Sequence, residues 1–500
     1  RLSLVGSEMC IRDRDSMKHP ILRKMIPAGM VMVLLAGCGE KKVDYEMETE
    51  QETKGVVGTL DEFREADNWD DSFTVTTSDG DVKVRINASI DVPKADTMSV
   101  VAAEELKIDV DYKKKFLKAY FKDSEIYYHD FEHLTKEELQ AAVDSMDGNI
   151  VAAQSQIDDL ENDAHHQDVE RHKEMLNEWK EEAEEQKKQY EKALETAKDT
   201  YTAAEDYDSC NEYAGYCGDL LCNVRFEVKE TNGNAIAYIV ASPLVKNKTD
   251  IYVDQYYGPQ SLKDYDTVYG NDTVTASIDK TESENGCSIS REDAKQLVEQ
   301  FLKETGRDNQ VLYGQQDYSW DGANEIEVDG EQYTDYAEVI DWGYLFGYGT
   351  GVNELAFSKS LNYINFDISW VTLENSDVNF ELEDEIRFAV TDNGITEVFM
   401  QYPVSITKIS KEVELLPLST IQNIIKDEII KNGDDYQLDE CKSFNKLKLG
   451  YARIKDDQKE GCYSYVPAWC LYMASGNDMN RHPVFVNAMD GTLIHPLDEM

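Results

Sequence analysis

Basic side chains, histidine, proline and long apolar runs are all scarce in this chain of 500 residues. It has 50 Lys and Arg against 100 Asp and Glu, which gives a formal net charge of −50, and it has 8 His and 10 Pro. Such a charge repels nucleic acid and anionic lipid head groups, so we expect no nucleic-acid partner. The main role that we assign to the charge is to keep the protein soluble and separate from other copies.

The usual motifs of catalysis and cofactor binding are also missing. No Gly-x-Ser-x-Gly, His-Glu-x-x-His, Walker A or Gly-x-Gly-x-x-Gly context is present, and no stretch matches the EF-hand loop. We therefore assign no catalytic residue, no metal ligand and no cofactor, and we favour a protein that is not an enzyme. A glycosidase-type pair of carboxylates stays open, because nothing singles one pair out among so many acidic residues.

One apolar run stands near the start of the chain, and no second run reaches the length that spans a membrane. Met25 to Leu35 follows a short basic stretch that begins at Met17, and it is too short to cross a bilayer as a mature helix. This pattern is typical of a secretory signal. We therefore predict a signal peptide over residues 17–37.

The end of this signal, Leu35-Ala36-Gly37-Cys38, resembles the lipobox of bacterial lipoproteins. The resemblance implies that Cys38 becomes the first residue of the mature protein and carries a covalent diacylglycerol and a fatty acid such as palmitate. We therefore expect a lipid-anchored protein on the extracytoplasmic face of the cell membrane. Residues 1–16 fit neither a signal nor a fold and resemble translated sequencing-adapter read-through, so we treat them as an assembly artefact.

Cysteine use is compatible with export, where disulfides persist. The chain has 9 Cys. Setting aside Cys10 in the artefact and Cys38 leaves an odd number, so at least one thiol is unpaired. Two groups are candidates for internal disulfides, with free buried thiols as the alternative: Cys210, Cys217 and Cys222 in one, and Cys441, Cys462 and Cys470 in the other. No histidine is paired in sequence with a cysteine, so nucleophilic use is not expected.

The first folded segment, after an acidic tether over residues 38–70, is predicted at residues 71–210. It opens with a β-hairpin around Ser78-Asp79-Gly80. Thr135 and Glu138 then form a capping box that begins a long helical stretch. Two coiled-coil-like apolar stripes follow, separated by the polar residues 161–168. We favour an antiparallel helical hairpin, which buries both stripes, over a single straight rod.

Two sets of polar residues in this segment allow a metal-site alternative. Glu161, His165, Asp168 and His172 would share one face of a continuous helix. His129 and His133 raise the same question. We interpret both sets as ordinary polar surface.

Residues 211–288 are predicted to be rich in β-strand, with a hairpin turn at Asn232-Gly233. Aromatic residues gather at Tyr252, Tyr256 and Tyr257, and again over residues 342–349. Aromatic faces can stack on sugars, although sheet packing is their commoner use. An envelope glycan-binding or glycan-hydrolysing lipoprotein is therefore our alternative function.

Two helix-then-strand segments follow, at residues 289–410 and 411–500. Ser290 to Gly306 and Ser419 to Gly433 are amphipathic helices with a serine start and a glycine stop. Strand-like runs come after both helices, and the last hairpin reads VFVNAMDGTLI. We therefore predict two modules, each a helix packed on an antiparallel sheet.

This capped helix with its terminal hairpin resembles PepSY-type modules, and the whole mature chain resembles uncharacterised lipoproteins of Gram-positive bacteria. The resemblance implies small α+β domains that regulate by binding, without catalytic residues. The predicted fold class is α+β: an N-terminal β-hairpin and a long helical hairpin, followed by two helix-on-sheet modules. The predicted function is a membrane-anchored binding or regulatory lipoprotein whose partner is another exported protein.

Overall fold

The computed structural model describes residues 60–78, 80–162, 169–231, 234–244, 260–261, 268–269, 272–273, 285–328, 331–357, 384–436, 438, 443–455, 459, 461–473 and 484–494. The predicted signal, the lipobox with Cys38, Cys441, and Tyr252, Tyr256 and Tyr257 lie outside these residues. So does most of the predicted tether.

The described chain is α+β and rich in strand, as the sequence predicts. Within the described residues, eight strands form one sheet, here called sheet I. Its strands are β1 (Trp69–Thr77), β2 (Gly80–Asp91), β3 (Ser99–Glu105), β17 (Val404–Glu412), β18 (Ser443–Lys455), β19 (Cys462–Met473), β20 (Val484–Asn487) and β21 (Leu493–Ile494).

Eleven described strands form the second sheet, here called sheet II. They are β4 (Tyr127–Tyr128), β5 (Thr202–Ala203), β6 (Glu212–Cys217), β7 (Leu220–Thr231), β8 (Asn234–Pro243), β9 (Gln260–Ser261), β12 (Gln310–Val328), β13 (Glu331–Val352), β14 (Leu355–Ala356), β15 (Glu385–Thr391) and β16 (Gly394–Gln401). A short separate pair is formed by β10 (Val268–Tyr269) and β11 (Asp272–Thr273).

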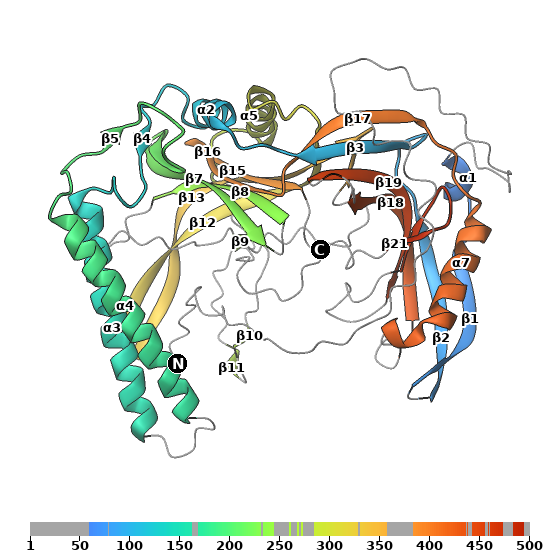
Figure 1. Ribbon diagram of the computed structural model, residues 1–500, viewed down its shortest axis with the longest axis horizontal. Coiled ribbons are helices and arrows are strands. Elements are labelled where there is room, and N and C mark those ends of the chain that lie inside the picture. Colours follow the sequence, from blue (N-terminus) through green and yellow to red (C-terminus); the bar gives the residue numbers. More distant parts are fainter. Residues whose placement is uncertain are drawn as a thin grey trace.

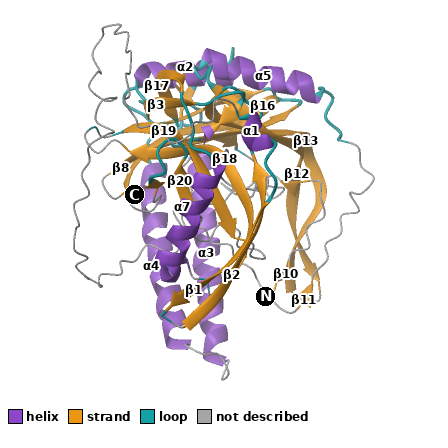
Figure 2. Ribbon diagram, turned by 90° about the vertical axis from the view of Figure 1, so that its right-hand side faces the viewer, coloured by secondary structure: helices purple, strands orange, loops and turns teal. Residues whose placement is uncertain are grey.

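Two helices, α2 (Val110–Phe121) and α5 (Arg291–Glu304), cover one face of sheet II (Figures 1 and 2). Phe301 of α5 lies between Phe116 of α2 and Phe388 of β15, with ring centroids 5.2 and 5.6 Å apart. All three rings are almost fully buried. Burial of such aromatic side chains is the main stabilisation of this layer.

The start and stop of α5 follow the sequence prediction. Ser290 accepts a hydrogen bond from the Asp293 amide at 3.1 Å, which is the expected N-cap. Gly306 has a φ of +74°, and the Arg307 amide returns to the Leu302 carbonyl at 2.7 Å. This left-handed glycine ends the helix.

Sheet I is covered by α7 (Leu418–Lys431), whose Ile421, Ile425 and Ile429 are buried in its core. The predicted serine cap at Ser419 is wrong, because α7 begins at Leu418 after Pro417 and has no side-chain cap. Proline supplies a suitable φ at this position without needing an amide donor. A short 3-10 helix, η1 (Gly433–Tyr436), follows α7.

The last part of the predicted tether is folded. The short helix α1 (Asp61–Arg64) lies within it, and Leu60 and Phe63 are each 2% exposed. The ring of Phe63 meets the buried Trp469 edge-on, with centroids 5.3 Å apart. Residues 60–70 therefore belong to the core of sheet I, because these two apolar side chains complete it.

Sheet I combines strands from two segments, residues 71–210 and 411–500, that the sequence predicts as separate units. β2 pairs in parallel with β18, and β3 pairs with both β17 and β19. Strands from residues 69–105 therefore share a sheet with strands from residues 404–494. The sequence cannot show this pairing, because strand propensity is local and the partners are more than 300 residues apart.

Two long helices, α3 (Lys136–Asn162) and α4 (Val169–Leu194), lie side by side and extend away from sheet II (Figures 1 and 2). Ala153, Ile157 and Ala183 are buried. Lys187 forms an ion pair with Asp147 at 2.5 Å, and the Lys180 ammonium donates to the Gln154 side chain at 2.7 Å. These contacts join α3 to α4. We call residues 136–194 the helical arm.

Candidate functional site at the base of the helical arm

A buried polar cluster lies where the helical arm joins sheet II. β4 leads into α3, and β5 follows α4. The two strands pair antiparallel, with Tyr127 opposite Ala203 and Tyr128 opposite Thr202. This pairing places His129, which follows β4, across from Tyr201, which precedes β5.

Glu138 is the centre of this cluster, although it is a carboxylate with only 7% of its surface exposed. One oxygen accepts hydrogen bonds from the Thr135 amide and hydroxyl, both at 2.8 Å. The other accepts from the Tyr201 hydroxyl at 2.8 Å and lies 2.9 Å from His129 Nε2. The Glu138 amide donates to the Thr135 hydroxyl at 3.3 Å, so the predicted capping box is present.

The pKa of Glu138 lies below its ordinary value. Burial by itself raises this pKa. The hydrogen bond and charge interaction with His129, and the hydrogen bonds from the Thr135 amide and hydroxyl, lower the pKa by more than burial raises it. The carboxylate is therefore held in its charged form, with its lone pairs occupied by protein donors. This one side chain connects the first turn of α3 to His129, next to β4, and to Tyr201, next to β5.

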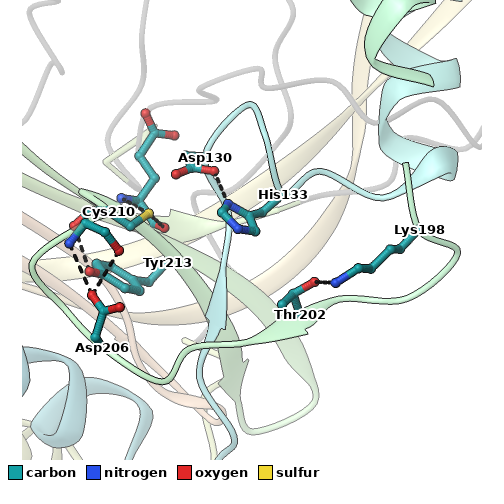
Figure 3. Close-up of polar contacts among 9 residues, drawn as sticks. Asp130, His133, Lys198, Thr202, Asp206, Cys210 and Tyr213 are labelled. Carbon is teal, nitrogen blue, oxygen red and sulfur yellow. Dashed lines mark hydrogen bonds and ion pairs between the residues drawn. The ribbon is translucent and has the colours of Figure 1, made fainter. Parts of the chain in front are cut away.

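A second set of side chains surrounds Asp130, one residue further along from His129. Its carboxylate bonds to His133 Nδ1, as Figure 3 shows, and the Cys210 side chain is also a hydrogen-bond partner. Burial raises the pKa of Asp130, and these two partners lower it to a net value below the usual one. His129 and His133 thus bind different carboxylates and do not share a site.

Cys210 is not activated as a nucleophile. Burial raises the pKa of its thiol to about 11, and the adjacent Asp130 carboxylate adds to that rise. The carboxylate stands between the thiol and the imidazole, whereas a nucleophilic cysteine requires the imidazole as its direct neighbour. This arrangement holds chain segments together and does not prepare an attack.

The chain that returns from α4 is tied to the same base. The Lys136 amide donates to the Lys198 carbonyl at 2.9 Å, and Lys136 forms an ion pair with Asp199 at 3.0 Å. The Lys198 ammonium donates to the Thr202 hydroxyl at 3.0 Å, which Figure 3 also shows. Both ends of the arm are therefore connected to each other as well as to the sheet.

A separate buried cluster joins sheet II to the start of β17. Arg307 donates to the Val404 carbonyl at 2.6 Å and forms an ion pair with Asp384 at 3.1 Å. Asp384 also accepts from the Thr350 amide at 2.9 Å. Burial raises the pKa of Asp384, and Arg307 and Thr350 oppose that rise. This cluster stabilises the connection between the two sheets.

No disulfide joins the described candidate cysteines, which are Cys210, Cys217, Cys222, Cys462 and Cys470. A bond between Cys462 and Cys470 is excluded, because both lie on β19. Eight residues of strand separate them by about 26 Å, far beyond disulfide reach. Cys217 and Cys222 lie on the neighbouring strands β6 and β7 as diagonal neighbours and do not stand directly opposite each other.

The remaining sequence candidates are spread over the chain. His172 lies exposed on α4, while Glu161, His165 and Asp168 belong to a stretch whose side chains are outside the described set. No group of three or more His, Cys, Asp or Glu could hold a metal ion in the part of the chain that the structure describes. Of the aromatic stretch at 342–349, Tyr344, Phe346 and Tyr348 are buried in the core beneath α5 and offer no face to a sugar.

The sequence did not indicate that Tyr201 would join His129 at Glu138, or that Cys210 would join His133 at Asp130. The capping box and the close spacing of His129, Asp130 and His133 were visible signals. The return of Tyr201 and Cys210 was not, because it depends on the β4–β5 and β4–β6 pairings.

Comparisons with known proteins add little to this picture. No protein-family model matches the chain, and no curated protein matches it. One solved structure, that of an uncharacterized protein from Eubacterium rectale ATCC 33656, is similar at 13% identity with a TM-score of 0.33. The match covers 85% of this chain and 93% of the other. Within the described residues, no helix is long and apolar enough to cross a membrane.

Proposed function

We propose that this protein is a lipoprotein, attached by a diacylglycerol at Cys38 to the extracytoplasmic face of the cell membrane, that works by binding another exported protein. The Leu35-Ala36-Gly37-Cys38 sequence after a basic and then apolar start supports the anchor. With one or more acyl chains at Cys38, the membrane is the first partner. The net charge of −50 favours a solvated protein that stands clear of the anionic lipid surface.

The helical arm is the observation that carries the binding proposal. Its longer helix has 27 residues, which corresponds to about 40 Å of helix. The Lys187–Asp147 ion pair and the Lys180–Gln154 hydrogen bond join α3 to α4, and the polar network around Glu138 holds the base of the arm. A fixed base presents the rest of the arm in one orientation, which lowers the entropy cost of binding a partner.

The surface of the arm indicates the chemistry of that partner. The sequence of α3 contains one basic side chain and seven acidic side chains, of which Glu138 is buried. Val151 of α3 is 68% exposed and Met175 of α4 is 36% exposed. An acidic helix surface with exposed apolar side chains suits a partner protein that has a basic surface around an apolar centre.

The two helix-covered sheets give further support. α5 on sheet II and α7 on sheet I belong to the two helix-then-strand segments at residues 289–410 and 411–500, and each sheet also takes strands from outside its segment. By sequence these segments resemble PepSY-type modules, which regulate by contact, so the proposed binding role agrees with them. The helix-on-sheet part, with the helical arm added, forms one regulatory binding protein in this proposal.

Site-specific photo-cross-linking in cells tests the binding proposal. A photoreactive residue at Val151 should give a discrete adduct with another exported protein. The same residue at Ile409, which is 50% exposed on β17 of sheet I, is the matched control and should give none. Binding to polysaccharides on an array, with no protein adduct at Val151, would replace this proposal by the glycan-binding alternative.

Fractionation tests the anchor separately. Cys38→Ala should move the protein from the membrane fraction to the soluble or unprocessed pool. A Cys38→Ala variant that is still processed and recovered with membranes would contradict the lipoprotein assignment.

A further inference from the structure

Strand β1 forms one end of sheet I, because β2 is its one neighbour among the described strands. Figure 1 shows β1 at the right-hand end of the molecule. Its pairing with β2 runs without a bulge over all nine residues, from Trp69 to Thr77. β1 also contains no proline and no lysine. A regular edge strand without these protective features is a template for another strand.

The backbone of β1 offers a row of hydrogen-bonding groups on the side away from β2. The turn between β1 and β2 has two residues, so Thr77 and Gly80 close it as a hydrogen-bonded pair. Such pairs alternate along an antiparallel ladder, so every second residue of β1 points its amide and carbonyl outward. These residues are Asp70, Ser72, Thr74 and Thr76, and all four are exposed. The edge is therefore accessible to a further strand.

A second copy of β1 fits this edge in the antiparallel direction. When Phe73 of each copy lies opposite Phe73 of the other, Ser72 faces Thr74 and Asp70 faces Thr76. Every outward residue then meets an outward residue of the second copy, so the amides of one strand reach the carbonyls of the other. Serine and threonine form favourable pairs across strands, and no carboxylate lies opposite another carboxylate. The edge is thus complementary to itself.

The charge around the edge is balanced, although the chain carries a net charge of −50. Over residues 70–76 and 81–87, the exposed charged side chains are Asp70, Asp81, Lys83 and Arg85. Arg85 lies opposite Ser72 and Lys83 lies opposite Thr74 in the β1–β2 register. The cations therefore flank the centre of the edge. Two copies can approach here without the repulsion that the acidic surface imposes elsewhere.

Helix α7 adds an apolar centre on the inner side of the edge. Its Lys426 forms an ion pair with Asp71 at 2.8 Å, and the ammonium lies 5.2 Å from the centre of the half-buried Phe73 ring. Ile430 follows Lys426 by one turn on the same side of α7 and is 42% exposed. Because Phe73 lies on the two-fold axis of the pairing, both copies bring Phe73 and Ile430 toward that axis. An apolar centre within a polar rim is the usual anatomy of an interface.

We propose that this protein forms a symmetric homodimer through β1, in which the two copies of sheet I become one continuous sheet. The inference rests on the edge of sheet I and does not depend on the proposed partner of the helical arm. An edge pairing of nine residues buries less than the standard interface of about 1,600 Å². We therefore expect a micromolar dimer. Salt should strengthen it, because ions screen the repulsion between the two acidic surfaces.

Sedimentation velocity of the purified full chain tests the proposal from micromolar to submillimolar concentration. The detergent micelles are in large excess, so that two chains do not share one micelle by chance. We expect a species of twice the monomer mass, whose fraction rises with protein concentration and with salt. A chain that stays monomeric over this whole range would overturn the proposal.

A matched pair of variants locates the contact at the outward amides of β1. Thr74→Pro removes one of these amides and leaves the ladder to β2 intact, because proline is tolerated where an edge amide faces solvent. It should stay monomeric with the circular dichroism spectrum of the wild type. Thr74→Ala keeps the amide and should dimerise like the wild type. A folded Thr74→Pro chain that still dimerises would contradict the proposed edge.

Cross-linking gives the register without relying on the proline variant. A photoreactive residue replaces Ser72, and isotope-labelled and unlabelled chains are mixed in equal amounts. We expect adducts that join a labelled to an unlabelled chain and that map to Thr74 or its neighbours in β1. Adducts between two chains at any other strand or helix would overturn the β1 pairing.

Discussion

The buried carboxylate at the base of the helical arm offers the sharpest test of how the arm is held. Glu138→Ala removes a side chain that accepts from the Thr135 amide and hydroxyl and from Tyr201, and that pairs with His129. It leaves His129 buried without its carboxylate and takes away the helix cap. Leaving buried hydrogen-bonding groups without this acceptor costs about 1–3 kcal/mol.

The loss should be largest in the arm. Amide hydrogen exchange across residues 136–162 should therefore accelerate in Glu138→Ala more than exchange in sheet I, because a local opening needs less free energy than global unfolding. Glu137→Ala is the matched control. It removes the same charge from the same helical turn at an exposed position, and it should change stability by about 0.5 kcal/mol or less.

The pH dependence follows from the sign of the shift. The pKa of Glu138 is lower in the folded protein than the ordinary 4.5, so its stabilisation is present above that value and is lost as pH falls through the folded pKa. The difference between wild type and Glu138→Gln should shrink over this acidic range. If Glu138→Ala costs no more than Glu137→Ala, or if that difference is unchanged in acid, the cluster does not hold the arm.

Three other predictions concern the sheets and their connection. Ile425→Asp should lower the free energy of unfolding by several kcal/mol, because it places a charge in the core of sheet I. Residues 415–500 alone should show no cooperative unfolding in denaturant, because they lack β1 to β3. A cooperative transition in that fragment would contradict the shared sheet. Burial raises the pKa of Asp384 above its ordinary 3.8, so its contribution to stability is present below that value and is lost as pH rises through the folded pKa. Asp384→Asn should therefore weaken the decline of stability over this pH range. An unchanged pH profile of thermal unfolding would contradict this. Gly343→Ala should lower the thermal midpoint, because a Cβ would lie 2.1 Å from the Val390 carbonyl oxygen, whereas Gly148→Ala, with nothing within 4 Å, should not.

Local structure could be predicted from the sequence where one short segment contains its own cause. The capping box at Thr135 and Glu138, and the serine cap and glycine stop of α5, are formed by residues close in sequence. The N-cap of α7 is Pro417, two residues before Ser419, which was predicted because serine is a preferred N-cap residue and proline is not. Segment boundaries are less reliable than the presence of an element.

Long-range pairing could not be predicted in the same way. The sequence has strand-like alternation at β1 and β2, but nothing in it indicates that β18 pairs with β2 or that β19 pairs with β3. The candidate site has the same difficulty. Histidines and carboxylates were visible near residue 130, but Tyr201 and Cys210 reach them only after the β-strands pair and the helical arm returns.

The shared strands of sheet I have a consequence for biosynthesis. The ribosome releases a chain from its N-terminus onward, so Trp69 to Glu105 emerge before the rest of sheet I. β18 and β19, which pair with β2 and β3, come from near the end of the chain, at residues 443–473. The edges of β2 and β3 must therefore stay without these partners until nearly the whole polypeptide has been synthesised. During that interval the protein would depend on chaperones or on its high charge to avoid aggregation.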